Sequence, residues 1–165
     1  MYKTQLKEKI SVLAKALETK DYKMATAESC TGGLLAKVAT DQSGSSRWFS
    51  RGVVTYSNLS KHELLGVDLS VLENYGAVSQ QTVEAMVDGL LKSEEVSIGV
   101  SISGIAGPDG GSPEKPVGTV WIAWKLFDSD VISRCFLFAG DREKVRLQAA
   151  IEAASGLISL LNADQ

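Results

Sequence analysis

Short apolar segments alternate with amphipathic helical segments along this chain, and this alternation restricts the possible folds more than any other feature. Residues 4–19 carry apolar side chains at steps of three and four, which predicts a helix. Residues 23–27 form a short apolar run, and we expect a buried strand that ends near Glu28. The polar turn 29–33 then leads into a helix that runs to about Thr40.

The middle of the chain continues this pattern. Residues 48–56 are rich in apolar and β-branched residues and predict a second strand, after which Asn58 is expected to cap a short helix. Another short helix is expected over 69–75, and Ser79 predicts the start of a longer one. The apolar residues expected on one side of that longer helix are Val83, Met86, Val87, Leu90 and Leu91.

The last part of the chain predicts a strand, a hairpin and a final helix. Residues 96–102 alternate between apolar and small residues, which predicts a strand with one buried face. A loop rich in glycine and proline, 105–116, precedes two strands over 118–127 and 131–138 that form a hairpin. A helix is expected from about Arg142 to Leu161.

These elements together predict an α/β fold, a three-layer α/β/α sandwich with a mixed sheet, in a single domain over residues 1–165. In such sheets ligands bind beyond the carboxyl ends of the strands. If the first three strands are parallel, the polar loops after Ala27, Thr55 and Ile102 open at the same edge. We therefore expect a binding site at that edge.

Composition excludes several classes of protein. Hydrophobic residues make up 44% and charged residues 22% of the 165, a balance typical of a soluble globular domain. The net charge of −3 argues against a duplex-binding protein, which needs a basic surplus. The first 21 residues interleave charged with apolar side chains, so neither a signal peptide nor a membrane span is expected there. We therefore expect a cytoplasmic location.

The cysteine and histidine content indicates neither disulfides nor a metal centre. Cys30 and Cys135 lie far apart and form no pairing framework, which fits a reducing compartment. With His62 as the only histidine and no CxxC pair, the chain lacks the ligand spacing of a zinc or iron site. We expect no metal and no organic cofactor.

The segment Ala27–Gly33 places a serine hydroxyl at a strand-to-helix turn, where free backbone N–H groups and the positive end of a helix dipole face the same space. A hydroxyl there can attack a carbonyl while nearby amides stabilise the oxyanion, so Ser29 is a candidate nucleophile. Two alternatives remain open at this point. Ser29 can be a simple helix cap, and the neighbouring Cys30 can be the nucleophile instead.

Tyr56 and Lys61 supply a phenol at a strand end and an amine in the following helix. A desolvated lysine can lose its proton near neutral pH and activate a hydroxyl, with Tyr56 relaying or positioning that proton. The alternative is a solvated surface lysine and a half-buried aromatic residue. His62 is expected to point elsewhere, because adjacent helical residues do not share a face.

Two further segments indicate binding. The glycine-rich loop from Ser103 to Gly111 can approach a ligand closely, but it matches neither the Walker spacing nor GxGxxG. Asp141 is expected to cap the last helix, and Arg142 to contact a phosphate or carboxylate. Arg142, Lys144 and Arg146 can equally form a solvated helix face.

Five motifs, in this order, resemble the C-terminal domain of the CinA family: TAESCTGG, GSSRWFSRGVVTYSN, GAVS, SISGIAGPDGGSPEKPVGTVW and GDR. The resemblance covers nearly the whole chain. Because the N-terminal domain of full-length CinA proteins is not seen, we expect the stand-alone PncC type. The resemblance implies hydrolysis of nicotinamide mononucleotide to nicotinate mononucleotide and ammonia, in pyridine nucleotide salvage, by a three-layer α/β protein that is often a homodimer.

The resemblance also implies roles for individual residues. Ser29 matches the proposed nucleophile, and Tyr56 and Lys61 match the groups that activate it, with no departure from the family pattern at the three positions. Combined with the residue patterns, it predicts a set of residues that border the oxyanion or the nucleotide: Cys30, Thr31, Gly32, Gly33, Ser46, Ser103, Gly104, Gly107 and Arg142. The alternative function is a non-catalytic nucleotide-binding or partner-binding regulatory module, in which Ser29 is only a cap.

Overall fold

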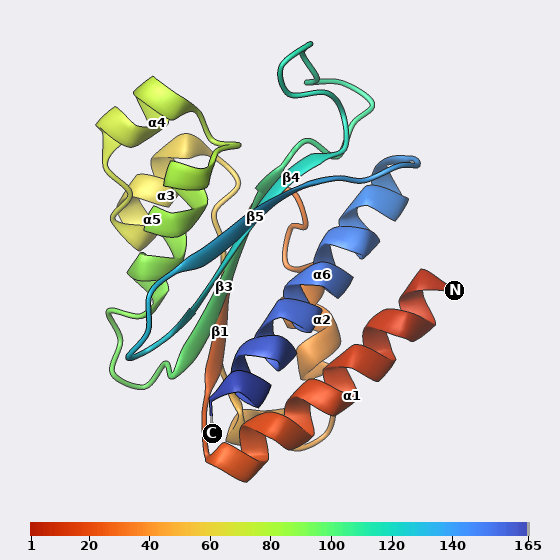
Figure 1. The fold of residues 1–165 in the computed structure, drawn as a ribbon, viewed down its shortest axis with the longest axis vertical. Helices are drawn as coiled ribbons and strands as arrows, with labels where there is room; N and C mark the ends of the chain where they lie inside the picture. The colour runs from red at the N-terminus through yellow and green to blue at the C-terminus, as the bar shows by residue number, and fades with distance from the viewer. Residues whose placement is uncertain (165) are drawn as a thin grey trace.

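The structure, a computed structural model that describes residues 1–164, is built on a five-stranded sheet with the order β2-β1-β3-β4-β5 (Figure 1). The strands are β1 Met24–Glu28, β2 Phe49–Val54, β3 Ile98–Gly104, β4 Thr119–Leu126 and β5 Ile132–Leu137. β1 pairs in parallel with β2 and β3, whereas β4 is antiparallel to both β3 and β5. The predicted mixed sheet and the predicted hairpin are confirmed.

Helices cover both faces of this sheet. One face packs against α1 (Tyr2–Lys20), α2 (Leu34–Thr40) and α6 (Arg142–Ala163). The opposite face packs against α3 (Asn58–Leu65), α4 (Leu69–Tyr75) and α5 (Gln80–Leu90), as the left side of Figure 1 shows. The predicted three-layer α/β/α sandwich is therefore confirmed.

Strand β3 is buried on both of its faces, so the prediction of a single buried face is wrong. Ile98, Val100 and Ile102 face the core beneath α1 and α6. On the other face, the hydroxyl of Ser101 donates to the α5 carbonyl of Val83 at 2.6 Å. Small residues on this face leave room for α5 to pack closely. The alternating sequence pattern does not distinguish a face that packs against a helix from a face that is exposed to solvent.

Side-chain caps begin four of the described helices, α3, α4, α5 and α6. Ser79 accepts from the N–H of Thr82 at the start of α5, and Asp141 accepts from the N–H of Lys144 at the start of α6, as predicted. The cap of α3 is Ser57, which accepts from the N–H of Ser60, so the prediction that Asn58 caps this helix is wrong by one residue. Both residue types favour this position, and only the backbone geometry decides between them.

The carboxyl ends of the three parallel strands meet at one edge of the sheet. Glu28 lies opposite Val54 of β2 and opposite Ile102 of β3. The loops after β1, β2 and β3 therefore open side by side, as expected. Among residues 1–164, none of the helices combines the length and the apolar character that crossing a membrane requires.

Candidate active site

A pocket of about 260 Å³ lies at this edge, between the ends of the parallel strands and the start of α6. It is lined by Ser29 from the turn after β1, Tyr56 from the loop after β2, and the glycine-rich loop after β3. The predicted site residues that line it are Ser29, Cys30, Tyr56, Ser103, Gly104, Gly107 and Arg142. Topology thus brings together segments that lie far apart in the sequence.

Lys61 reaches Ser29 from behind the pocket. Its side chain is fully buried in the α3 layer, and its Nζ lies 3.2 Å from the Oγ of Ser29. Nζ also donates to the carbonyl of Thr55 at 2.7 Å and lies 3.4 Å from the carbonyl of Tyr56. This arrangement excludes the alternative of a solvated surface lysine.

The surroundings of Lys61 suit the neutral amine. Burial lowers the pKa of the Lys61 ammonium from the ordinary value of 10.5. A neutral amine has two hydrogens and one lone pair. The carbonyls of Thr55 and Tyr56 can accept the two hydrogens, so the lone pair is left to face the Ser29 hydroxyl. The geometry therefore supports proton transfer from Ser29 to Lys61.

Cys30 does not have the environment of a nucleophile. Its thiol is buried, and burial raises its pKa to about 11. A thiol with this pKa stays protonated at neutral pH, whereas the attacking species of a catalytic cysteine is the thiolate. Ser29, which is 8% exposed at the pocket and contacts a base, is the better candidate of the two.

Tyr56 lies at the mouth of the pocket. It is 61% exposed, and its hydroxyl accepts a hydrogen bond from Arg142 at 3.0 Å. The same guanidinium donates to the carbonyl of Gly107 at 2.8 Å. Because Lys61 reaches Ser29 directly, proton transfer between these two residues does not require Tyr56 as a relay.

The glycine-rich loop forms the opposite wall. Gly107 has a φ of 84°, a left-handed conformation that favours glycine. At Gly104 a Cβ would lie 2.6 Å from Val120 and 2.8 Å from the Thr119 carbonyl, so only glycine fits there. Ser103, which precedes it, is buried in the protein and lines the pocket. Gly104 and Gly107 both line the pocket, where the lack of a Cβ lets the backbone come close to a ligand.

The role predicted for the turn amides stays a prediction, because the turn residues Thr31, Gly32 and Gly33 are not part of the pocket lining. The Thr31 hydroxyl points inward and donates to Glu28, and the N–H of Gly32 donates to the Ser29 carbonyl at 3.0 Å. The amides at the start of α2 are likewise occupied by the Glu28 carboxylate, so this helix end does not present them to a ligand.

Ser46 was also predicted to border the nucleotide. It lies in a short 3₁₀ turn, Ser45–Arg47, that precedes β2 and is therefore at the amino edge of the parallel strands. The pocket lies at the carboxyl edge. Ser46 thus does not border the pocket of its own chain. It shares a sequence motif with Tyr56, but the two residues lie at opposite ends of β2.

Glu28 and Arg146 are the residues that the sequence interpretation missed or left undecided. Glu28 was predicted only as the end of a strand, yet it is a buried carboxylate beside the nucleophile. A charged residue in an otherwise apolar strand was the available signal. Arg146, left as a solvated helix residue or a binding residue, donates to the carbonyls of Cys30 and Thr31.

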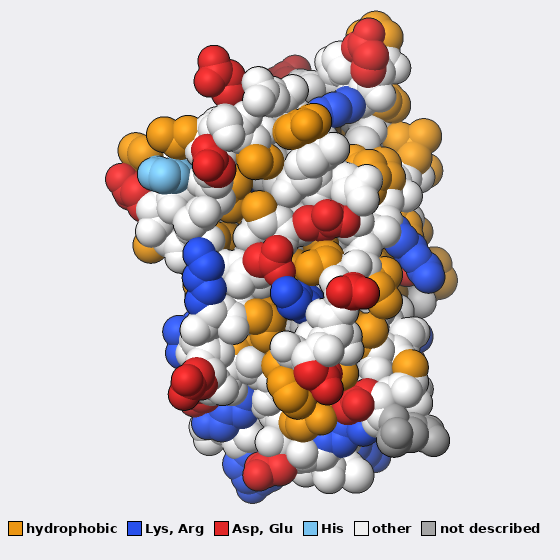
Figure 2. All heavy atoms as spheres, turned by 60° about the vertical axis from the view of Figure 1, so that its left-hand side comes forward, with side chains coloured by type: hydrophobic (Ala, Val, Ile, Leu, Met, Phe, Trp, Pro, Cys, Tyr) orange, Lys and Arg blue, Asp and Glu red, His pale blue; other side chains and the backbone are white. Residues whose placement is uncertain are grey.

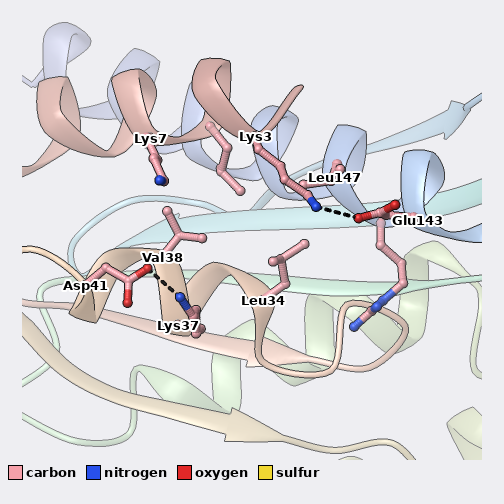
Figure 3. A pocket seen from close by; sticks show the side chains of 10 residues that line it. Lys3, Lys7, Leu34, Lys37, Val38, Asp41, Glu143 and Leu147 are labelled. Carbon is pink, nitrogen blue, oxygen red and sulfur yellow. Dashed lines mark hydrogen bonds and ion pairs between the residues drawn. The ribbon is translucent and has the colours of Figure 1, made fainter. Parts of the chain in front are cut away.

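A larger pocket, of about 350 Å³, lies elsewhere, between α1, α2 and α6 (Figure 3). It has an apolar floor that includes Leu34 and Leu147. At its rim, Figure 3 shows two ion pairs between side chains, Lys3 with Glu143 and Lys37 with Asp41. We place the active site in the smaller pocket, because that one holds a nucleophile beside a base.

Acidic and basic side chains are interspersed on the face that Figure 2 shows, where the α3–α5 layer comes forward. Within residues 1–164, no group of three or more histidine, cysteine, aspartate or glutamate side chains is arranged to hold a metal ion.

Comparison with known proteins identifies the family. The model of the CinA C-terminal domain matches residues 5–161. The chain is 59% identical to the nicotinamide-nucleotide amidohydrolase PncC of Enterobacter agglomerans, over 82% of this chain and 83% of that protein. It is 50% identical to the protein of the same name from Escherichia coli K12, over 93% and 91% of the two chains.

A solved structure agrees with these sequence matches. The crystal structure of the competence/damage inducible protein CihA from Agrobacterium tumefaciens superposes with a TM-score of 0.92 at 38% identity, over 96% of each chain. This likeness extends over all three layers of the sandwich. By its sequence and by its fold, the chain belongs to the CinA C-terminal domain family.

Proposed function

We propose that this chain is a nicotinamide-nucleotide amidohydrolase that converts nicotinamide mononucleotide and water to nicotinate mononucleotide and ammonia. The observation that carries the catalytic part of the proposal is the buried Lys61 Nζ, 3.2 Å from the Ser29 Oγ that lines the pocket. The names and high identities of the PncC relatives support the substrate and the reaction.

In the first half of the reaction, the neutral amine of Lys61 accepts the hydroxyl proton as Ser29 Oγ attacks the carboxamide carbon. The tetrahedral intermediate then collapses. Its C–N bond breaks, and the Lys61 ammonium gives its proton to the departing nitrogen, so ammonia leaves. The product of this half is an ester between Ser29 and the nicotinoyl group, and Lys61 is neutral again.

In the second half, a water molecule gives a proton to Lys61 and attacks the ester carbon. The bond to Ser29 Oγ breaks, and the Lys61 ammonium returns the proton to this oxygen. The acid product leaves, and both residues regain their starting state. One water is consumed and one ammonia is released, and the two residues handle every proton without a metal ion or an organic cofactor.

The pocket mouth supplies the binding groups. The guanidinium of Arg142 donates to two neutral acceptors, Gly107 and Tyr56, and none of the described carboxylates forms an ion pair with it. Its positive charge is thus available to a substrate phosphate. Tyr56 orients Arg142 in this proposal, and Ser103, Gly104 and the buried Cys30 border the substrate.

The proposal includes a setting and an assembly. A free thiol at Cys135 and one at Cys30 fit a reducing cytoplasm, where salvage of pyridine nucleotides takes place. Exposed apolar side chains on α3 and α4, among them Leu59, Leu64 and Leu69, favour a homo-oligomer. Light scattering after size exclusion tests the assembly, because a mass of 17.6 kDa would mean a monomer.

Ammonia release from nicotinamide mononucleotide by the purified chain tests the function. We expect turnover by the parent and a loss of at least about 10³-fold in Ser29→Ala, since a missing nucleophile removes the covalent route. Ser60→Ala removes a half-buried hydroxyl on α3 that donates to the Ser57 carbonyl, so it serves as the matched control and should keep parent activity. A folded parent that binds the nucleotide but releases no ammonia would instead indicate a non-catalytic binding module.

A further inference from the structure

The turn that carries the nucleophile, residues 29–33, is held on two sides by residues of opposite charge. Glu28 lies beneath it within the protein, and Arg146 reaches it from α6. Neither contacts the Ser29 hydroxyl or the Lys61 amine, and Arg146 does not line the pocket. Their contacts converge on the backbone and the threonine hydroxyl of this turn and on the start of α2.

The carboxylate of Glu28 is 1% exposed and accepts four hydrogen bonds. Oε1 accepts from the hydroxyl of Thr31 at 2.8 Å and from the N–H of Leu35 at 2.9 Å. Oε2 accepts from the N–H of Ala36 at 3.0 Å and from the hydroxyl of Thr26 at 3.2 Å. A buried charge is tolerated only with such full pairing, and the positive end of the α2 dipole stabilises it further.

The guanidinium of Arg146 holds the outer side of the turn. Nε donates to the carbonyl of Cys30 at 3.1 Å, and one terminal nitrogen donates to the carbonyl of Thr31 at 2.9 Å. The same nitrogen lies 3.3 Å from the position of a Cβ at Gly32, where φ is 60°. The contact therefore joins α6 to the carbonyls of the two residues that directly follow the nucleophile.

We propose that Glu28 and Arg146 are positioning residues that together hold Ser29 in its attacking geometry. This inference rests on the proposed function, because it assumes attack by Ser29. Ser29 directly follows Glu28, and its Oγ must stay near Lys61 on one side and the substrate carbon on the other. A misplacement of about 1 Å is enough to cost about 10²-fold in rate.

The two oxygens of Glu28 explain why a carboxylate is required rather than an amide. Each oxygen accepts two hydrogen bonds, one of them from a backbone N–H of α2. A glutamine has a single oxygen, so its NH₂ group would face the N–H of either Leu35 or Ala36. Two donors cannot pair, and the start of α2 would have to shift together with the turn.

The first test compares Glu28→Gln with Glu95→Gln. Glu95 accepts from Lys23, Ser50 and Arg51 near the opposite edge of the sheet, so it controls for loss of a well-bonded carboxylate. Both are assayed well below their unfolding temperatures, with activity expressed per folded molecule. For Glu28→Gln we expect kcat to fall by about 10- to 100-fold and KM to change by less than about threefold.

Hydrogen exchange supplies a second measurement that does not depend on turnover. The amides of residues 29–36 should exchange faster in Glu28→Gln than in the parent, whereas those of β4 should not change. A merely structural role would lower the unfolding temperature but leave kcat per folded molecule unchanged. A kcat within about twofold of the parent in folded Glu28→Gln overturns the proposal.

Arg146→Met tests the outer contact and decides the question if Glu28→Gln does not fold. Methionine keeps the apolar stem but removes both donors to the turn. We expect about a tenfold loss of kcat, against none in Arg47→Met, which breaks only an exposed ion pair with Glu18. An Arg146→Met variant with parent kcat overturns the positioning role.

Labelling of Ser29 by a phosphonofluoridate separates this proposal from the proposed function. If the parent releases no ammonia, the amidohydrolase function fails, but the labelling rate still reports how the turn holds the hydroxyl. Slower labelling in Glu28→Gln and Arg146→Met than in their controls supports the positioning role. Equal rates in all variants overturn it, whatever the natural substrate is.

Discussion

At the scale of single residues, burial decides the chemistry. Lys61 is fully buried and contacts Ser29, so its amine is both destabilised as a cation and placed where a base is needed. Cys30, which follows Ser29 in the turn, is also buried, but burial raises the pKa of its thiol and so keeps it protonated and unreactive. Burial thus favours the reactive neutral form of the Lys61 amine and the unreactive protonated form of the Cys30 thiol.

The lowered pKa of Lys61 predicts a pH profile. The ammonium form cannot accept a proton, so kcat/KM should rise with pH through the pKa of this group and level off below the ordinary lysine value of 10.5. In Lys61→Arg the guanidinium stays charged, and kcat/KM should fall by at least about 10²-fold across the profile. A variant that keeps both the rising limb and the activity would rule out Lys61 as the base.

The raised pKa of Cys30 predicts tolerance to its replacement. Because the thiol, with a pKa of about 11, is not the nucleophile, Cys30→Ala should keep kcat within about fivefold of the parent. The small cavity that it leaves should lower the free energy of unfolding by about 1 kcal/mol. Ammonia release and urea unfolding measure the two effects. A loss as large as that in Ser29→Ala would reinstate Cys30 as a candidate nucleophile.

At the scale of elements, local patterns predicted the strands and helices, and packing decided what they missed. Spacing at three and four residues predicted α1 and α5, and the turn between β4 and β5 predicted their hairpin. The second buried face of β3 was missed, because small polar residues beneath a helix look like a solvent-exposed face. Contacts between α6 and the sheet were also outside the reach of local patterns.

Gly156 on α6 makes one such contact, with Trp124 of β4. A Cβ there would lie 2.1 Å from the ring of Trp124, whose Nε1 donates to the carbonyl of Ala153 at 2.8 Å. Helix propensity alone predicts that Gly156→Ala stabilises by about 1 kcal/mol. We expect the steric clash with Trp124 to outweigh this gain, so that Gly156→Ala lowers the free energy of unfolding by about 1–3 kcal/mol. Urea unfolding tests this, with Ser155→Ala as the control, and a stabilised Gly156→Ala would contradict the packing described.

At the scale of the whole molecule, the parallel arrangement of β1, β2 and β3 creates the site. The sequence placed Ser29, Tyr56 and Ser103 at strand ends, and topology brought them to one pocket. Distance along the chain was a poor guide elsewhere. Ser46 lies only three residues before β2, a strand of the site, yet it lies at the end of that strand opposite to the pocket. The amides near Thr31, Gly32 and Gly33 were expected to hold an oxyanion or a phosphate. The N–H of Gly32 donates to the Ser29 carbonyl, and Glu28 binds the N–H groups of Leu35 and Ala36, which come next in the chain.

The two-residue mechanism predicts that activity does not require a metal ion. Ser29 supplies the nucleophile and Lys61 moves each proton, so no step calls for a Lewis acid. Treatment with a chelator followed by desalting should leave the rate of ammonia release unchanged. Loss of turnover in protein that stays folded, with recovery on addition of a divalent cation, would show that this mechanism is incomplete.

Hydroxylamine trapping during turnover of nicotinamide mononucleotide tests the central claim, an acyl intermediate on Ser29, most directly. We predict that hydroxylamine diverts product from the acid to the hydroxamate, because it competes with water for the Ser29 ester. Ser29→Ala should form neither product. An active parent that yields only nicotinate mononucleotide at every hydroxylamine concentration, or a Ser29→Ala variant that still releases ammonia at the parent rate, would contradict the account.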